Sequence, residues 1–158
     1  MQKTISTPSA ASIGSTIGSP VGSPLLMLGL RSFHDVPAKG HQLIRKGLSS
    51  RVIEPVSQYL GLGKGVLAQY MDLDRGTATR LSAKGQDLPP HAAETLLRLV
   101  EIYDMAADVF ATKAGASTWL RTPHPLLDNE VPLDAIKTSY GAQLVKNLLM
   151  STKYGGAA

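Results

Sequence analysis

The chain contains no cysteine, and its apolar runs are short. Without cysteine, neither disulfides nor thiolate metal sites can form. The longest apolar run, residues 25–30, is far shorter than the roughly 20 residues that a membrane helix needs. The segment after Lys3 is polar and small rather than apolar, so we expect no secretory signal and no membrane partner. We therefore expect a cytoplasmic protein.

A strong charge of either sign is also missing. The net charge is +4 over 158 residues, and the sequence pI is near 9.4. This mild basic excess permits contact with nucleic acid without requiring it. Hydrophobic residues make up 43% of the chain, which is enough for one core in one domain or in two small ones.

The composition of the chain and the spacing of its apolar residues change after the first two dozen residues. Residues 1–24 consist mainly of Ser, Thr, Gly, Pro and Ala, which offer little to pack, so we expect a flexible arm. From about Pro37 the apolar residues follow helical spacing, and no stretch alternates with period two. The predicted fold class is all-α. We expect a larger helical part over residues 25–112 and a small helical domain over residues 113–158.

The first predicted helices end at glycines. "PAKGHQLIRKG" predicts a helix that stops at Gly47, and "SSRVIEPVSQYLG" predicts one that begins at Ser49 or Ser50 and stops at Gly61. The following "GLGKG" has no preceding strand and lacks the spacing of a phosphate loop, so we interpret it as a helix stop followed by a helix start.

The segment "GKGVLAQYMDLDRGTATRLSAKG" has the pattern of a helix-turn-helix. A first helix carries an apolar stripe with Val66 inward, and Ala68 is small enough for a helix crossing. Asp74 is suited to cap a second helix, whose inward residues are Ala78 and Leu81. That helix would expose five side chains suited to phosphates and base edges: Arg75, Thr77, Thr79, Arg80 and Lys84.

Two interpretations of this second helix stand at this point. It is a recognition helix for DNA, or it is an ordinary amphipathic helix that carries two arginines. Asp72 and Asp74 lie close to where phosphates would be, and Asp72 takes the position at which many such turns have glycine. Spacing alone favours neither interpretation.

The strongest helical pattern is "DLPPHAAETLLRLVEIYDMAADVFA". We assign one face to apolar residues that include Leu96, Val100, Tyr103 and Phe110. The other face is assigned to charged residues: Glu94, Arg98, Glu101, Asp104 and Asp108. The apolar face is broader than one short neighbouring helix would cover, and we expect it to form a homodimer.

No catalytic or metal-binding constellation is present. His34, His41, His91 and His124 have no partner at ligand spacing, and no serine lies in a nucleophile elbow. We therefore expect no metal, no cofactor and no enzymatic activity.

The last third of the chain carries a family resemblance. "GASTWLRTPHPLLDNEVPLDAIKTSYGAQLVKNLL" predicts a helix ending in Trp-Leu, a turn, a short helix begun by Pro132, and a final helix capped by Thr138 with Leu144 and Leu149 inward. The order of "WL", "TP", "PLL", "PLD", "T..G" and "V..LL" resembles the toxin-binding domain of the Xre/MbcA/ParS antitoxins. "RKGLSSRVIEPVSQYLGL" and "RGTATRL" are similar to the Xre-like helical part of the same family.

The resemblance implies an antitoxin of a type II toxin–antitoxin pair. Its partner would be a RES-type or related toxin that consumes NAD or transfers ADP-ribose, and it would repress its own operon by binding operator DNA. The chain departs from the family pattern at Asp128, Asn129, Glu130, Val131 and Ser151. The alternative is a stand-alone dimeric transcriptional regulator that uses its C-terminal domain only for self-association.

The resemblance also gives a role to the final "STKYGGAA". Two glycines allow close approach to another backbone, and a tyrosine supplies a flat anchor. We expect the final helix to stop near Met150 and the tail to enter the toxin's active-site cleft. The expected toxin-binding residues are Lys153, Tyr154, Gly155, Gly156, Ala157 and Ala158.

Overall fold

The computed structural model describes residues 22–155, and within that range it is helical with no strand. The predicted all-α class is confirmed. The α-helices are, in chain order, α1 (Pro24–Met27), α2 (Val36–Lys46), α3 (Ile53–Leu60), α4 (Lys64–Tyr70), α5 (Arg75–Lys84), α6 (Pro90–Phe110), α7 (Lys113–Leu120), α8 (Pro132–Ala135) and α9 (Ser139–Lys153). Three 3₁₀ turns connect them: η1 (Phe33–Asp35), η2 (Ser50–Val52) and η3 (Pro125–Leu127).

The predicted helix stops and caps are where local chemistry puts them. Gly47 and Gly61 end α2 and α3 in backbone conformations with positive φ, and Ser49 caps η2 at the approach to α3. Asp74 caps α5 and Thr138 caps α9 through side-chain oxygens that accept backbone N–H groups. The end of α9 was predicted wrongly, because the helix continues past Met150 to Lys153.

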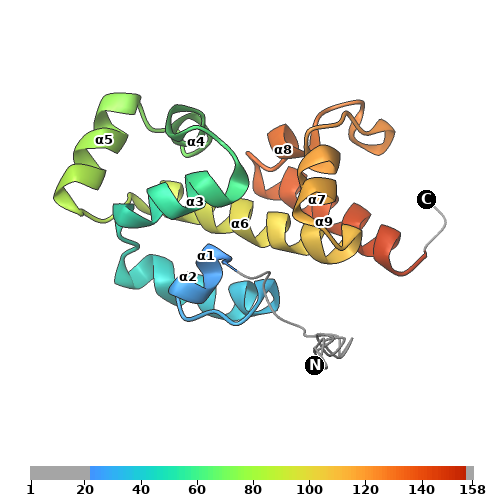
Figure 1. Cartoon of the computed structure of the whole chain (residues 1–158), viewed down its shortest axis with the longest axis horizontal. Helices are drawn as coiled ribbons and strands as arrows, with labels where there is room; N and C mark the ends of the chain where they lie inside the picture. The colour runs from blue at the N-terminus through green and yellow to red at the C-terminus, as the bar shows by residue number, and fades with distance from the viewer. Residues whose placement is uncertain (1–21, 156–158) are drawn as a thin grey trace, which may run out of the picture.

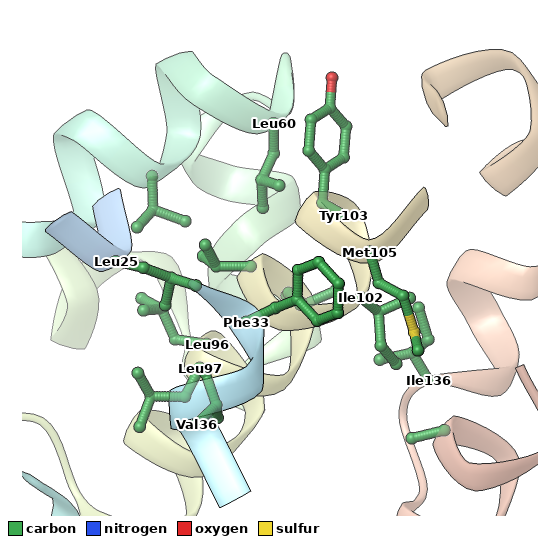
Figure 2. Packing of buried hydrophobic residues seen from close by; sticks show 14 of the residues in the cluster. Leu25, Phe33, Val36, Leu60, Leu96, Leu97, Ile102, Tyr103, Met105 and Ile136 are labelled. Atoms are coloured by element: carbon green, nitrogen blue, oxygen red, sulfur yellow. The ribbon is translucent and has the colours of Figure 1, made fainter. Parts of the chain in front are cut away.

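Helix α6 runs through the middle of the molecule, and α1, α2, α3, α7 and α9 pack against it (Figure 1). Helices α3 to α5 lie towards one end of α6 in this view, and α7 to α9 gather at the other. Buried side chains from α1, η1, α3 and α6 meet in one core, and Ile136 after α8 joins it (Figure 2).

The position of α6 corrects its predicted faces. Glu101 is 7% exposed and Asp104 is fully buried, although both were assigned to the charged face opposite the apolar one. Asp104 accepts hydrogen bonds from the hydroxyls of Ser23 and Tyr59, at 2.6 and 2.7 Å. Glu101 is paired with Lys146 of α9. Helices pack on several sides of α6, so the expected division into an apolar and a polar face fails there.

The surface expected to form a homodimer is covered by the chain itself. Leu96, Val100 and Tyr103 are buried in the single chain, and the Phe110 ring packs against Trp119 at 5.7 Å between centroids. The argument for self-association through this face is therefore removed.

Three further expectations are corrected by burial. The predicted arm extended to residue 24, yet Ser23 and Pro24 are buried at the start of α1; the rest of the arm, residues 1–21, lies outside the described residues. Val66 and Leu144, both predicted to face inward, are exposed. Other residues of the same helices, among them Leu67, Val145 and Leu149, fill the inward positions.

Candidate functional site

Helices α4 and α5 form the predicted helix-turn-helix. Ala68 is buried, as a close helix crossing requires. The Asp74 carboxylate accepts the Thr77 N–H at 2.8 Å and a further hydrogen bond from the Thr77 hydroxyl. These hydrogen bonds lower the pKa of Asp74 below its ordinary value, so the cap is charged at neutral pH. The start of α5 is therefore firmly defined.

The turn between the two helices contains a non-glycine residue in the left-handed region. Asp72 has φ of 56°, which is the conformation that glycine adopts most readily. This conformation explains why many such turns have glycine at the position of Asp72. Aspartate is one of the few other residues that tolerates this conformation.

The five predicted DNA-contacting residues do not share one surface. Thr77 is committed to the cap, as described above. Arg75 and Thr79 line a cavity beside α5. Arg80 and Lys84 are exposed elsewhere on the helix, and Lys84 lies about 180° around the axis from Arg75, since nine residues separate them. By the same count Thr79 lies about 40° from Arg75, and Lys84 lies about 40° from Arg80, so the exposed residues form two groups on different sides of α5.

Two basic residues outside α5 were missed as candidates and line the same cavity. Arg51 comes from η2 and Lys64 from the first turn of α4. Lys64 forms an ion pair with Glu54, and its ammonium group lowers the pKa of that carboxyl. Only the packing of η2 and α3 against α4 and α5 brings these charges together, so the linear sequence offered no direct signal for them.

The "T..G" motif has a structural role at the start of α9. The Thr138 hydroxyl accepts the Gly141 N–H at 3.0 Å. A Cβ added at Gly141 would lie 2.0 Å from the carbonyl oxygen of Ala135, so α8 and α9 can approach this closely only with glycine there. The motif therefore caps α9 and permits its close approach to the end of α8.

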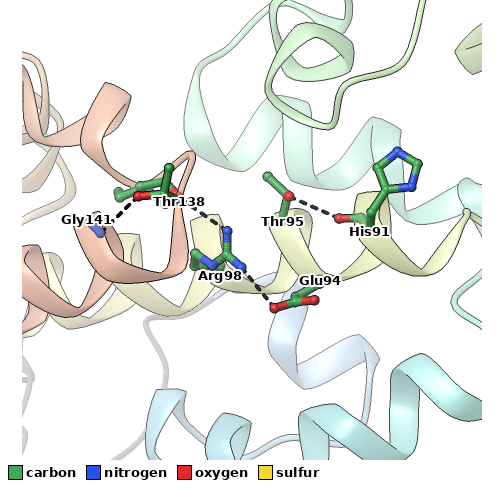
Figure 3. Close-up of polar contacts among 7 residues, drawn as sticks. His91, Glu94, Thr95, Arg98, Thr138 and Gly141 are labelled. Carbon is green, nitrogen blue, oxygen red and sulfur yellow. Dashed lines mark hydrogen bonds and ion pairs between the residues drawn. The ribbon is translucent and has the colours of Figure 1, made fainter.

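The same junction is fastened to α6 by Arg98. Its guanidinium donates to the carbonyl oxygen of Ile136 at 3.3 Å and pairs with Glu94 at 2.9 Å. Figure 3 shows Arg98 on α6 pointing towards the segment that carries Thr138 and Gly141, with Glu94 on its other side. The Tyr70 hydroxyl of α4 also donates to Asp134 of α8 at 3.1 Å, and burial raises the pKa of Tyr70 to about 12.

Large apolar side chains are left exposed along α9 and at its end. Tyr140 is 86% exposed, Leu144 is 54% exposed and Tyr154 is 70% exposed. Residues 140 and 144 are one helical turn apart, and 154 falls near the same side after about four turns. The structure thus defines an apolar stripe, Tyr140, Leu144 and Tyr154. Tyr154 was predicted as a toxin-binding residue, whereas Tyr140 was not singled out and Leu144 was assigned to the core.

The base of the predicted tail is tied to α6. Lys153 Nζ lies 2.5 Å from a carboxylate oxygen of Asp108, and this hydrogen bond raises the pKa of Lys153. Gly155 follows with φ of 67°. Gly156, Ala157 and Ala158 lie outside the described residues. Lys153 was expected to bind the toxin, and in this structure its ammonium group is already paired with Asp108 of the same chain.

The geometry offers no centre for metal chemistry in residues 22–155, because no three His, Asp or Glu side chains gather there to hold a metal ion. Among the same residues, no helix is long and apolar enough to cross a membrane. The described surface instead carries a helix-turn-helix and, on α9, an exposed apolar stripe. This combination is that of a protein that binds macromolecules through two different parts.

The comparisons with known proteins agree with both parts. Residues 39–101 match the family model of the antitoxin Xre-like helix-turn-helix domain. Residues 105–155 match the model of the antitoxin Xre/MbcA/ParS C-terminal toxin-binding domain. The chain belongs to the Xre/MbcA/ParS antitoxin family, as the sequence motifs predicted.

Two curated relatives span most of the chain. An "Antitoxin Xre" from Yersinia enterocolitica serotype O:8 / biotype 1B (strain NCTC 13174 / 8081) is 26% identical over 113 residues, covering 71% of this chain and 76% of the relative. A "Prs ADP-ribosylating antitoxin" from Sphingobium sp. (strain YBL2) is 24% identical over 125 residues, covering 73% of this chain and 79% of the relative.

Proposed function

We propose that this protein neutralises a toxin by docking it on the apolar stripe of α9 and directing the C-terminal tail into the toxin's active-site cleft. The observation that carries the proposal is the stripe itself, because Tyr140, Leu144 and Tyr154 expose large apolar surfaces inside the matched toxin-binding domain. Exposed aromatic and leucine side chains on one helix face are suited to a protein partner.

The Lys153–Asp108 pair supports the role of the tail. It holds the last turn of α9 on α6, so that Tyr154 and the residues after it start from a fixed position. A fixed starting point lowers the entropy lost when the tail binds in a cleft. We propose a RES-type toxin that consumes NAD or transfers ADP-ribose, in line with the family resemblance and with the name of the Sphingobium relative. The antitoxin supplies no catalytic step.

Co-expression with the toxin encoded beside its gene tests this proposal. Removal of residues 153–158 should leave folding intact and weaken protection of growth and of cellular NAD, and Tyr154→Ala should reproduce part of that loss. Leu144→Ser should weaken capture of the toxin in a pull-down. Arg45→Gln, an exposed change on α2, is the matched control. Full protection by both the truncated protein and Leu144→Ser would contradict the proposal.

We further propose that the α4–α5 unit binds operator DNA in the cytoplasm and represses the protein's own operon. Arg75 and Arg80 are exposed on α5, and Arg51 adds positive charge beside it. Exposed arginines on a recognition helix read guanine edges and bind phosphates.

The DNA proposal separates base contacts from phosphate contacts. Arg80→Ala should weaken operator binding by about 1–3 kcal/mol, whereas Lys84→Ala should mainly lower the salt dependence. Toxin neutralisation should survive both changes. Fluorescence anisotropy with the promoter fragment at several salt concentrations measures both effects. Unchanged binding by the Arg75→Ala/Arg80→Ala double variant would remove α5 from the interface.

The alternative function, a stand-alone dimeric regulator, is less well supported. It would pair two chains through its C-terminal domain, and the α6 face that was separately expected to form a homodimer is buried within one chain. A homodimer formed through another surface, such as the α9 stripe, would have to give way when the toxin docks there.

A further inference from the structure

A cavity of about 650 Å³ lies between η2, α3, α4 and α5, on the helix-turn-helix part of the molecule. Its volume is within the range of small-molecule sites in proteins, roughly 300–1,000 Å³. Four of the residues that line it have small or apolar side chains: Ile53, Ala68, Ala78 and Ala83. Direct contacts to DNA phosphates need exposed cations and no apolar cavity, so DNA binding alone does not account for it.

Two arginines, Arg51 and Arg75, line this cavity, and their guanidinium groups have no partner in the described part of the chain. Neither the Arg51 nor the Arg75 guanidinium has a hydrogen bond or an ion pair there. The third cation, Lys64, is neutralised by Glu54. The lining therefore keeps two uncompensated positive charges.

Each guanidinium lies against a glycine. A Cβ on Gly65 would be 2.6 Å from Nη2 of Arg75, and a Cβ on Gly85 would be 2.6 Å from Nε of Arg51. Residues 75 and 85 are about 15 Å apart along α5, at 1.5 Å per residue. The two arginines thus lie near the two ends of α5, and the lining residues Ala78 and Ala83 come from the part of α5 between these ends.

We propose that this cavity is a binding site for a small amphipathic organic anion. The apolar body of the ligand lies on Ile53 and the alanines, and its carboxylate or sulfonate pairs with the Arg51 or Arg75 guanidinium. Guanidinium groups bind such planar or multi-oxygen anions through paired N–H donors. The site requires neither toxin nor DNA, so it does not depend on the functions proposed above.

If the α4–α5 unit binds operator DNA as proposed above, a ligand in this cavity would also affect DNA binding. A bound anion would hold Arg75 and cover Thr79, and both side chains belong to the proposed DNA surface. Ligand and DNA would then compete. The protein would release its operator when the ligand is abundant, in addition to any effect of the toxin.

The first experiment uses the full chain and 8-anilinonaphthalene-1-sulfonate, an apolar anionic fluorophore. We expect saturable one-to-one binding, with amide chemical-shift changes confined to η2, α3, α4 and α5. The Arg51→Gln/Arg75→Gln variant should bind at least tenfold more weakly, and Ala83→Phe, which fills the cavity without changing charge, should abolish binding. Arg45→Gln is the matched control for loss of a positive charge outside the cavity. Circular dichroism checks that every variant is folded.

Shift changes on the α9 stripe instead, or equal binding by wild type and both cavity variants, would overturn the site. The second experiment measures anisotropy of the labelled promoter fragment with and without the fluorophore. A loss of DNA affinity in the wild type and none in Ala83→Phe supports competition, and unchanged wild-type affinity at saturating fluorophore overturns it. If the fragment does not bind at all, the proposed DNA function fails while the first experiment still decides the ligand site.

Discussion

At the scale of single residues, Asp72 and Glu101 hold conformations or charges that are costly in isolation. Asp72 occupies the left-handed region of the helix-turn-helix, and Glu101 is a carboxyl group buried against α9. Each cost is offset by its surroundings, and each can be measured by a substitution that removes one component at a time.

Replacing Asp72 by glycine should raise the free energy of unfolding by up to about 1 kcal/mol, because the Cβ no longer opposes a positive φ. Asp72→Asn keeps a residue that tolerates this conformation and removes the charge, so its stability should change by less than about 0.5 kcal/mol. Urea unfolding compares the two. Any gain in DNA affinity from the lost carboxylate should be shared by both variants. A less stable Asp72→Gly protein would show that the turn is not strained.

The stability of the protein should depend on pH through Glu101. Burial raises the pKa of Glu101 above its ordinary value of 4.5, although Lys146 and Arg98 oppose the shift. The folded state then keeps a proton that the unfolded state has lost. The contribution of Glu101 to stability is therefore complete below pH 4.5 and is lost as the pH rises through the folded pKa.

Comparison with Glu101→Gln isolates this effect. The wild type should lose stability relative to Glu101→Gln as the pH rises above 4.5, as measured by urea unfolding. Glu94→Gln removes a largely exposed carboxylate from the same helix and is the control. Parallel pH profiles for wild type and Glu101→Gln would contradict the prediction.

At the scale of the helices, local signals could be predicted from the sequence and tertiary ones could not. The Asp74 and Thr138 caps and the Gly61 stop depend on neighbouring residues alone, so they were found. The burial of Glu101 depends on α9, whose Lys146 is 45 residues away from Glu101 in the sequence. No periodicity within α6 predicts that contact. The cavity beside α5 was missed for the same reason, because three separate segments of the chain build it.

Gly141 gives a test of packing at the start of α9. Alanine normally stabilises a helix by about 1 kcal/mol relative to glycine. At Gly141 we expect the opposite, a loss of about 1–3 kcal/mol, because the added Cβ would meet the Ala135 carbonyl. Gly40→Ala in α2 is the matched control, since its Cβ would lie 3.4 Å from a Val36 methyl carbon, an ordinary contact. Thermal unfolding of both variants gives the sign, and stabilisation by Gly141→Ala would refute the close approach.

At the scale of the whole molecule, the two matched parts are joined by more than the chain. Besides the Arg98 and Tyr70 contacts, Arg121 donates to the carbonyl oxygen of Leu60 at 3.2 Å, and the Lys146–Glu101 pair links α9 to α6. Helix α6 contributes buried side chains to both parts. The Xre-like helix-turn-helix part and the C-terminal toxin-binding part therefore share one core.

This shared core predicts one cooperative unfolding transition. Scanning calorimetry should give equal calorimetric and van't Hoff enthalpies, and circular dichroism and tryptophan fluorescence should report the same midpoint. Trp119 lies in the C-terminal part, so its fluorescence reports that part specifically. Two separate transitions would contradict a common core.

The passage of α6 through both parts also fixes their rotational phase. The matched regions end at residue 101 and resume at residue 105, inside one continuous helix. Each residue inserted there would turn the C-terminal helices by about 100° and move them by about 1.5 Å. The direction in which the α9 stripe faces, relative to α5, therefore depends on the number of residues in α6. A chimaera that exchanges the C-terminal part with that of a relative must be joined in helical register at this point.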